Sequence, residues 1–329
     1  NVDTVIATAS GALGAAIGVV TNIITTDHST GVVVTGTSTD KSSLTGTSVS
    51  VDADAKEGIS SLLIAASGAQ YAAVSASVNV NRQLSDVSAA VDQTEVLGSF
   101  AQNANYLGRI TTSAITAAGS QYAAVPISVV INYADNAVSS SVAHSILRAE
   151  GQSASVGANR ISEFSSLNVT ASGAMYGAAA GLVNVNTIEG ATSAEVNDSE
   201  VKAGQFSVNA ENEDHLKVTD VTATGAIGSL GASVVVSYFK GSSAANLRNS
   251  IVTADKLTVS SLQDHYVNGT VAFASGGIGT IGANVFSLVI GSGDNPFASN
   301  RQDLGSAEDT VNKYLSDYAS SGTGSLGFI

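Results

Sequence analysis

A repeat of about 53 residues is the sequence feature that most limits how this chain can fold. Six windows share a pattern in which a small residue and a glycine precede alternating small, apolar and polar residues. The anchor glycines are Gly11, Gly68, Gly119, Gly173, Gly225 and Gly276, separated by 57, 51, 54, 52 and 51 residues. Such a period is typical of architectures in which each unit buries its apolar surface against its neighbours.

A second landmark repeats out of phase with the first. In it, an apolar residue is followed three positions later by a hydroxyl residue and then by a further strand-like segment. The hydroxyl residues are Thr47, Thr94, Ser145, Ser199 and Ser250, separated by 47, 51, 54 and 51 residues. Because two landmarks recur with nearly the same period, a whole unit repeats.

Within each unit, apolar and polar residues alternate with a period of two, which predicts β-strands. A unit of about fifty residues fits either a propeller blade or two to three coils of a parallel β-solenoid. The chain has no Trp, and no hairpin motif recurs, whereas stacked coils favour Ala, Val, Ser, Thr and Asn ladders about 4.8 Å apart. We therefore predict an all-β parallel β-helix (β-solenoid) of about six units over residues 1–290. A loop-rich tail, 291–329, is expected to follow, with a short helix at 306–318.

The repeat also predicts which side chains share a face. Apolar side chains of a strand normally face the core, so we expect two columns of aliphatic residues to point inward. These are Val78, Val129 and Val183, and beside them Val80, Ile131 and Val185. Asn81, Asn132 and Asn186 share one repeat position and are expected on the opposite face or at a turn. Pro126 has no N–H for a ladder, which predicts a corner or an edge there.

Charge and composition exclude several classes of partner. The chain has 13 basic and 27 acidic residues, giving a formal charge of −14, which disfavours nucleic acid and anionic membrane surfaces. Its mean hydropathy of +0.24 excludes disorder. The apolar runs fall short of the ~20 residues that a transmembrane helix needs. The chain has no Cys, which suits an exported bacterial protein, and its start at Asn1 is interpreted as that of a segment of a longer protein.

The cycle of Ala-Ser-Gly-Ala, alternating small and apolar residues, Val-Asn-Val-Asn and Ala-x-Val-x-x-Ser-x-Val resembles the repeats of very large secreted filamentous adhesins. These are Gram-negative proteins of the filamentous haemagglutinin and leukotoxin type, exported by type V or two-partner secretion. The resemblance covers roughly residues 5 to 290. It implies an elongated stalk outside the cell, at the bacterial surface or outer membrane. The partners it implies are neighbouring repeats of a longer parent chain, host-cell or matrix receptors, and other copies of the chain.

We predict no catalytic, cofactor-binding or metal-binding residue, and we expect that the chain is not an enzyme. The Gly-x-Gly-x-x-Gly segment at 277–282 is followed by a strand-like sequence, whereas dinucleotide binding needs a helix there. The pairs Asp27-His28, Asp214-His215 and Asp264-His265 place neighbours on opposite faces of a strand, so neither member can pair with the other. His215 and His265 lie 50 residues apart and are interpreted as repeated loop or strand-end positions.

Other polar groups are interpreted as solvated surface. Two acidic clusters, 211–214 and 195–200, lack the glycine repeat of calcium-binding β-rolls and are interpreted as solvated loops. The Asn-x-Ser/Thr triplets at Asn168, Asn197 and Asn268 matter only in a eukaryotic secretory pathway. Two alternatives to a stalk remain. One is a self-assembling extracellular fibre subunit, and the other is a parallel β-helix enzyme that acts on polysaccharide.

Overall fold

A computed structural model describes residues 1–291. The chain divides into two units, Asn1–Ile290 and Gly291–Ile329, and the predicted helix at 306–318 lies outside the described residues. Within the described part, twelve strands and no helix are present. The predicted all-β parallel β-solenoid is confirmed.

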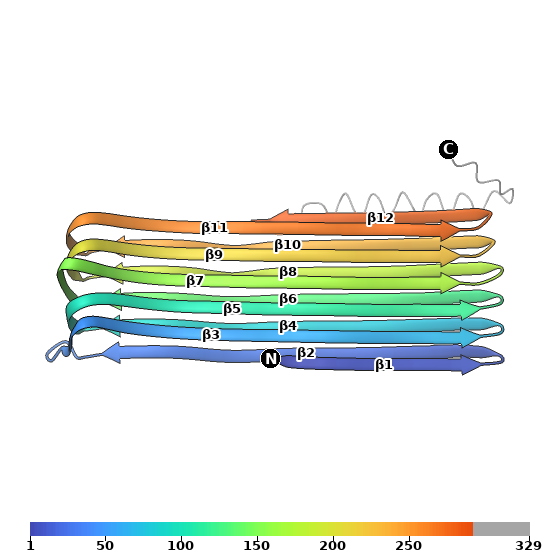
Figure 1. Cartoon of the computed structure of the whole chain (residues 1–329), viewed down its shortest axis with the longest axis horizontal. Helices are drawn as coiled ribbons and strands as arrows, with labels where there is room; N and C mark the ends of the chain where they lie inside the picture. The colour runs from blue at the N-terminus through green and yellow to red at the C-terminus, as the bar shows by residue number, and fades with distance from the viewer. Residues whose placement is uncertain (292–329) are drawn as a thin grey trace. The chain divides into compact units, whose positions relative to one another are not determined.

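The strands alternate between two six-stranded parallel sheets (Figure 1). Sheet A contains β1 (Val2–Ala12), β3 (Ser42–Ala69), β5 (Thr94–Ser120), β7 (Ile146–Gly173), β9 (Glu200–Gly225) and β11 (Ile251–Gly276), in that spatial order. Sheet B contains β2 (Ala15–Thr35), β4 (Ala72–Asp92), β6 (Ala123–Ala143), β8 (Gly177–Asn197), β10 (Gly228–Arg248) and β12 (Gly279–Ile290), stacked in the same direction. Each inner strand therefore pairs with the equivalent strands of the preceding and following repeats, and each end strand pairs with one such strand.

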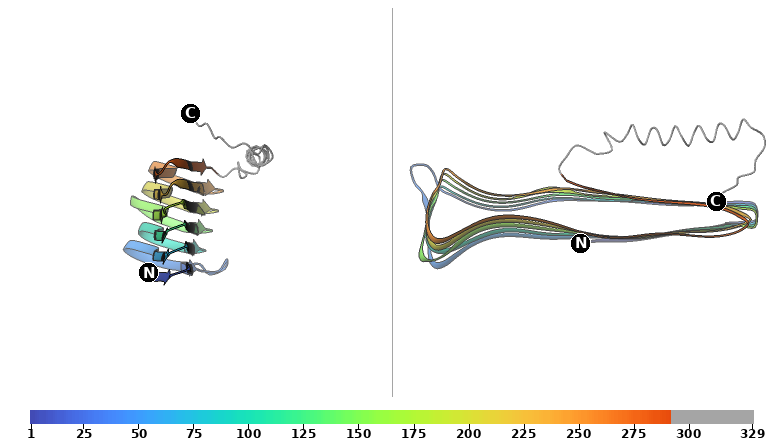
Figure 2. Two further views of the ribbon diagram at one scale, coloured as in Figure 1. Left: turned by 90° about the vertical axis from the view of Figure 1, so that its right-hand side faces the viewer. Right: turned by 90° about the horizontal axis from the view of Figure 1, so that it is seen from above.

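Each repeat forms one coil, and the expectation of two to three coils per repeat is wrong. A coil consists of two long strands, such as the 21 residues of β4 and the 27 residues of β5. The inside-outside alternation of these strands runs on without turn residues, so the chain cannot reverse within them. Seen along the stack, the six coils superpose almost without twist (Figure 2). Stacked side-chain ladders are one way to hold a flat sheet.

The two ends of each coil differ. At the tight end, two or three residues connect a sheet A strand to the following sheet B strand, as at Gln70 and Tyr71. The rings of Tyr71, Tyr122 and Tyr176 stack there with centroids 5.4 and 5.3 Å apart, which places them on adjacent coils. At the wide end, the two sheets are farther apart (Figure 2) and sheet A strands contain bulges.

A glycine makes one of these bulges possible. Gly98 has φ of +120°, and a Cβ there would lie 1.8 Å from the Gly46 carbonyl oxygen of the preceding coil. The register of β3 against β5 shifts at the same place, between Thr45 and Ser48. Only glycine fits this close approach of two backbones.

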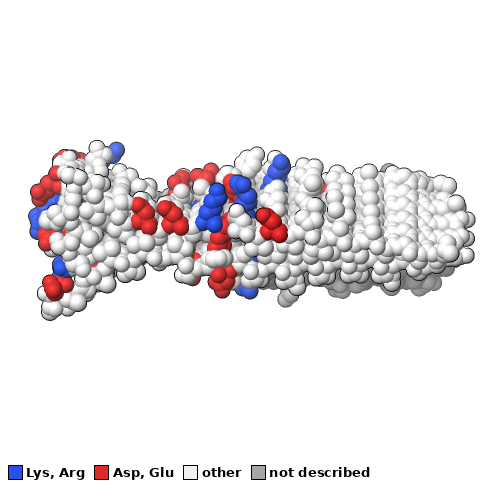
Figure 3. Space-filling view, turned by 60° about the horizontal axis from the view of Figure 1, so that its bottom comes forward, with Lys and Arg blue, Asp and Glu red and all other residues white. Residues whose placement is uncertain are grey.

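The wide half of the coil has a conventional core. Large inward side chains such as Phe100, Leu147 and Phe206 are at most 2% exposed and pack in one cluster. Charged residues lie on its outer surface (Figure 3). This half buries apolar area in the usual way.

The tight half reverses that pattern, and the predicted faces are wrong. In β4, Ser75, Ser77, Asn79 and Asn81 point inward and are at most 1% exposed. The aliphatic columns that were expected inside point outward instead. They comprise Val78, Val129 and Val183, and Val80, Ile131 and Val185. The sheets lie close together here (Figure 2), and the small polar side chains inside bond to one another, as described below.

Pro126 lies neither at a corner nor at a sheet edge, contrary to expectation. It is buried in β6, which lies inside sheet B between β4 and β8. It stays in register with Ser75 of β4, while the pairing of β6 with β8 lapses between Ala124 and Ile127. The sheet thus tolerates the missing N–H by a local break on one side.

Candidate functional site

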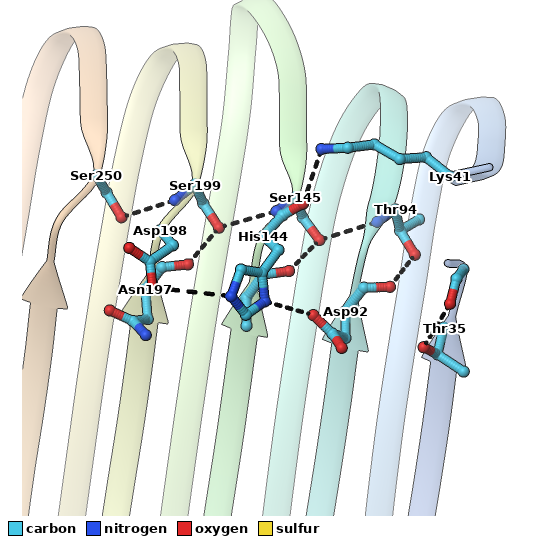
Figure 4. Close-up of polar contacts among 12 residues, drawn as sticks. Thr35, Lys41, Asp92, Thr94, His144, Ser145, Asn197, Asp198, Ser199 and Ser250 are labelled. Carbon is cyan, nitrogen blue, oxygen red and sulfur yellow. Dashed lines mark hydrogen bonds and ion pairs between the residues drawn. The ribbon is translucent and has the colours of Figure 1, made fainter. Parts of the chain in front are cut away.

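A ladder of hydroxyl groups connects the coils at the wide end (Figure 4). The Ser145 Oγ accepts a hydrogen bond of 3.1 Å from the Thr94 backbone N–H of the preceding coil and donates one of 2.6 Å to the Ala143 carbonyl. Ser199 repeats both contacts one coil further, toward Ser145 and Asn197. The hydroxyls of Ser145, Ser199 and Ser250 therefore each close their own turn and join it to the preceding coil.

This ladder explains the second sequence landmark and corrects its first member. Thr94, Ser145, Ser199 and Ser250 occupy equivalent positions in successive coils. Thr47, however, lies in β3, whereas the residue in register with Thr94 is Ser42. An insertion at 36–41 in the first wide-end turn hides this register from the sequence.

The residue before each hydroxyl has a left-handed backbone. Gln93, His144, Asp198 and Asn249 have φ between 46 and 49°, a conformation that costs non-glycine residues about 1 kcal/mol or more. The His144 ring lies between two carboxylates of adjacent coils, with Nδ1 2.9 Å from Asp92 and Nε2 3.8 Å from Asp198 (Figure 4). These solvent-exposed contacts of His144 join the wide-end turns of three successive coils.

A buried charged cluster lies in the middle of the coils. The Arg160 Nη2 lies 3.0 Å from the Asp214 Oδ1, and both side chains are fully buried. The other Asp214 oxygen lies 3.1 Å from the His265 Nδ1. Burial lowers the pKa of Arg160 and raises that of Asp214, and their mutual attraction opposes both shifts.

These three residues come from β7, β9 and β11, so the cluster connects three coils. The Arg160 Nη1 also donates to the Glu189 carbonyl of sheet B at 2.8 Å. A molecule in solvent cannot contact the buried Arg160 or Asp214 while the coils are closed. The cluster therefore joins the sheets and offers no site for chemistry on a dissolved substrate.

Hydroxyl and amide groups form a hydrogen-bonded network inside the tight half, beside buried apolar residues such as Leu63 and Leu182. Asn81 donates to the Thr112 Oγ1 of the opposite sheet at 2.9 Å and to the Asn132 Oδ1 of the next coil at 3.0 Å. Asn132 continues the ladder to Asn186 at 2.9 Å, as the shared repeat position predicts. Ser77 makes a 2.6 Å bond to Thr116 across the interior. These bonds hold both the stack and the two sheets.

One carboxylate belongs to this network. Asp220 is fully buried and accepts from the Asn168 Nδ2 at 2.7 Å and the Asn184 Nδ2 at 3.2 Å. Burial raises its pKa from 3.8 to about 6, although the two amides oppose the shift. The Asp220 carboxyl therefore stays protonated up to a higher pH in the folded protein than in the unfolded chain.

This pKa predicts that stability falls as the pH rises. Because folding raises the pKa of Asp220, the loss occurs between pH 3.8 and about 6 and then levels off. Asp220→Asn is expected to stabilise β9 by up to about 3 kcal/mol at pH 7 and to have little effect below pH ~3.5. Hydrogen exchange of β9 amides measures this change. Asp86→Asn, an exposed position, serves as the control, and an equal gain in both variants would contradict the prediction.

The Asp-His pairs behave partly as expected. Asp214 points inward and His215 outward, so these neighbours do not pair. The expectation that His215 and His265 are repeated loop or strand-end positions is wrong. Both lie inside long strands, and their registers differ by one, because His215 is opposite Tyr266 and His265 is opposite Asp214. The sequence does contain a signal for the contact between Asp214 and His265. The two residues lie 51 positions apart, which is the length of one coil.

The acidic clusters do not converge. Glu211 and Glu213 lie on the outer face of β9, whereas Asp214 points inward. In the second cluster, Glu195 and Glu200 lie in strands and pair with Arg248 and Lys202, so they are not in loops. No group of three or more His, Asp or Glu side chains within residues 1–291 is placed to hold a metal ion.

Shallow grooves cross the outer face of sheet A. A groove of about 600 Å³ follows the repeated Ala-Ser-Gly motif and is lined by Ala, Gly, Ser and Thr residues, including Ala117, Gly119 and Gly173. A smaller one, of about 370 Å³, lies among Arg109, Glu163 and Lys217, where Arg109 already pairs with Glu163. The segment at 277–282 leads into β12, so a strand follows it as predicted.

The geometry defines a class of protein, a parallel β-solenoid built from single-coil repeats. No family model, curated protein or solved structure matches this chain. Among the residues that the structure describes, no helix could cross a membrane.

Proposed function

We propose that this chain is a stalk segment of a secreted or surface-anchored bacterial filamentous protein of the adhesin type. Its stacked coils hold binding modules away from the cell and support attachment to host cells, matrix or other bacteria. The observation that carries the proposal is the stack of equivalent coils within residues 1–291. The resemblance of the repeats to filamentous adhesins supports it.

Both ends of the described stack expose side chains that face the interior elsewhere. Leu257 of β11 is 49% exposed and Phe286 of β12 is 40% exposed, whereas their register partners Phe206 and Val235 are buried. No residue of β1, β11 or β12 is buried. A further coil stacked on either end would cover these residues and pair the free strand edges.

A stalk must keep its coils together under tension along the stack. Pulling the protein between its first and last coils is expected to give force peaks at regular spacing, since each coil detaches separately. One coil of 51 to 57 residues releases roughly 180–200 Å of chain. A variant that lacks residues 145–198 joins two equivalent turn positions and is expected to stay folded and to lose one peak.

The matched control removes residues 145–171, which is half a coil. It joins the wide-end turn to the tight half of a strand and is expected to disrupt the neighbouring coils. Loss of all coils in one step, or collapse of the 145–198 deletion, would contradict the stalk proposal. So would turnover of an acidic polysaccharide that depends on residues of this chain.

The open end coils also favour one second candidate, a self-assembling fibre subunit. In that case separate copies would stack end to end, with β11 and β12 of one copy against β1 and β2 of the next. Electron microscopy would then show fibres that lengthen with protein concentration. A stalk segment is expected to give no such fibres.

A further inference from the structure

The outer face of sheet B in the tight half is aliphatic. Its outward positions form four columns across β4, β6, β8 and β10, and in β2 and β12 two of the corresponding positions are the polar Thr21 and Ser287. In β4, β6, β8 and β10 the outward residues are Val74, Ala76, Val78 and Val80; Val125, Ile127, Val129 and Ile131; Ala179, Gly181, Val183 and Val185; and Leu230, Ala232, Val234 and Val236. Ile17, Val19 and Ile23 of β2 and Ile281, Ala283 and Val285 of β12 extend the columns. We call this surface the apolar face.

The apolar face is flat and large. The coils superpose with almost no twist (Figure 2), so equivalent side chains end at the same level. Six strands spaced about 4.8 Å apart, with seven residues rising about 3.3 Å each, give a face of roughly 650 Å². Two such faces in contact would bury about 1,300 Å², within the usual range for a specific dimer. Monomers seldom leave an apolar surface of this size in water.

In sheet B the outer positions that adjoin the apolar face carry one charged residue, Arg82. In sheet B the first charged residues beyond the apolar face are Asp27, Arg82, Asp135, Glu189 and Lys240. The outer surface of the tight half that Figure 3 shows is free of charge. Within residues 1–291, the charged residues therefore lie mainly toward the wide half, with Asp3, Lys217 and the buried Asp220 as exceptions.

We propose that the apolar face binds the apolar face of a second copy of this chain. The two-fold axis would lie in the plane between the two faces, parallel to the stack of coils. The two tight halves would then overlap, and the two wide halves would point in opposite directions. Two strongly acidic molecules could then associate without bringing their carboxylates together. The contact would be isologous, with the Val78, Val129 and Val183 column near the axis.

A lipid surface fits the same face less well. Among the described residues, the edges of β2 and β12 beside the apolar face have no strand partner, and hydrocarbon could not hydrate their backbone groups. Two copies that pair through their apolar faces leave the β2 and β12 edges in water, where further coils can still stack on them. The net negative charge also opposes approach to anionic lipids.

Sedimentation equilibrium tests the proposal. The intact chain is expected to form dimers as its concentration rises from the nanomolar to the hundred-micromolar range. Val183→Glu is expected to raise the dimer Kd at least about tenfold, because it buries an unpaired carboxylate in the contact. Ser193→Glu is the matched control, since Ser193 lies ten residues along the same strand on the same outer side; it is expected to leave the Kd unchanged.

A second measurement locates the contact. The chain has no Cys, so a single Cys reports on its own neighbourhood. Val183→Cys is expected to form an intermolecular disulfide under mild oxidation, because the two-fold axis brings the two copies of this position together. Ser193→Cys is expected to remain reduced. Hydrogen exchange of β8 checks that each variant is folded.

Three outcomes would overturn the proposal. The first is a chain that stays monomeric at every concentration. The second is association that Val183→Glu leaves intact, which would indicate stacking through the end coils. The third is binding of zwitterionic vesicles by a chain that does not self-associate. None of these depends on whether the chain is a stalk, since coil-by-coil unfolding under force is a separate result.

Discussion

Aspartate at position 128 is expected to destabilise the solenoid by about 3–5 kcal/mol, whereas aspartate at position 129 is expected to cost about 1 kcal/mol or less. Ser128 is fully buried and accepts a 3.0 Å hydrogen bond from the Ser77 hydroxyl of the preceding coil. A carboxylate there would have no cationic partner among its neighbours in the hydroxyl network. Val129 points outward, so its replacement leaves the charge in water.

Hydrogen exchange measures this contrast coil by coil. In Ser128→Asp, protection is expected to fall first in β4, β6 and β8, and last in the distant coils, because coupling in solenoids is between neighbours. Val129→Asp lies on the apolar face, so both variants are compared at concentrations where the chain is monomeric. Equal damage from the two substitutions, or greater damage at 129, would show that the inward face is assigned wrongly.

Removing the buried guanidinium is expected to have an effect of similar size. Arg160→Met removes the guanidinium that lies 3.0 Å from Asp214 and leaves this carboxylate fully buried beside the His265 imidazole. Breaking a buried ion pair on one side typically costs about 3–5 kcal/mol, because the remaining charge has lost its partner. Hydrogen exchange of amides in β7 and β9 is expected to report this loss.

The double variant Arg160→Met, Asp214→Leu is the matched comparison. It removes both charges and keeps a similar side-chain volume, so most of the lost stability is expected to return. If the double variant loses the sum of the two single effects, Arg160 and Asp214 do not interact energetically. Arg248→Met, an exposed arginine at the wide end, is expected to have little effect.

The sequence predicts the repeat, the parallel solenoid and the Asn ladder because equivalent residues recur at one coil spacing. It does not predict that Asn81 faces inward, because the partners that satisfy its amide lie far away. Thr112 is 31 residues and Asn132 is 51 residues along the chain. Whether a polar column is buried depends on which column of the other sheet lies opposite it. That pairing follows from the lengths of the strands and turns, which local alternation does not fix.

The charged cluster was missed for a related reason. The Asp-His neighbours at 214 and 215 attract notice, yet the contact forms between Asp214 and His265 of the next coil. Arg160 has no partner nearby in sequence, since its ion pair spans 54 residues. This cluster can be found in the sequence by looking for charged residues that lie one coil apart. A search among residues close in sequence does not find it. The repeat period is thus the relevant distance for contacts in this chain.

The uninterrupted strands couple the character of the surface to that of the core. In β4 the odd-numbered positions face inward along the whole strand, from Ala73 to Val91. The apolar Val87, Ala89 and Val91 in the wide half therefore set the phase that carries Ser77 and Asn79 inside further back. One added residue between the halves would shift that phase and exchange an aliphatic exterior for one of hydroxyls and amides. The number of residues in each strand therefore decides whether water meets an aliphatic or a polar outer surface in this protein.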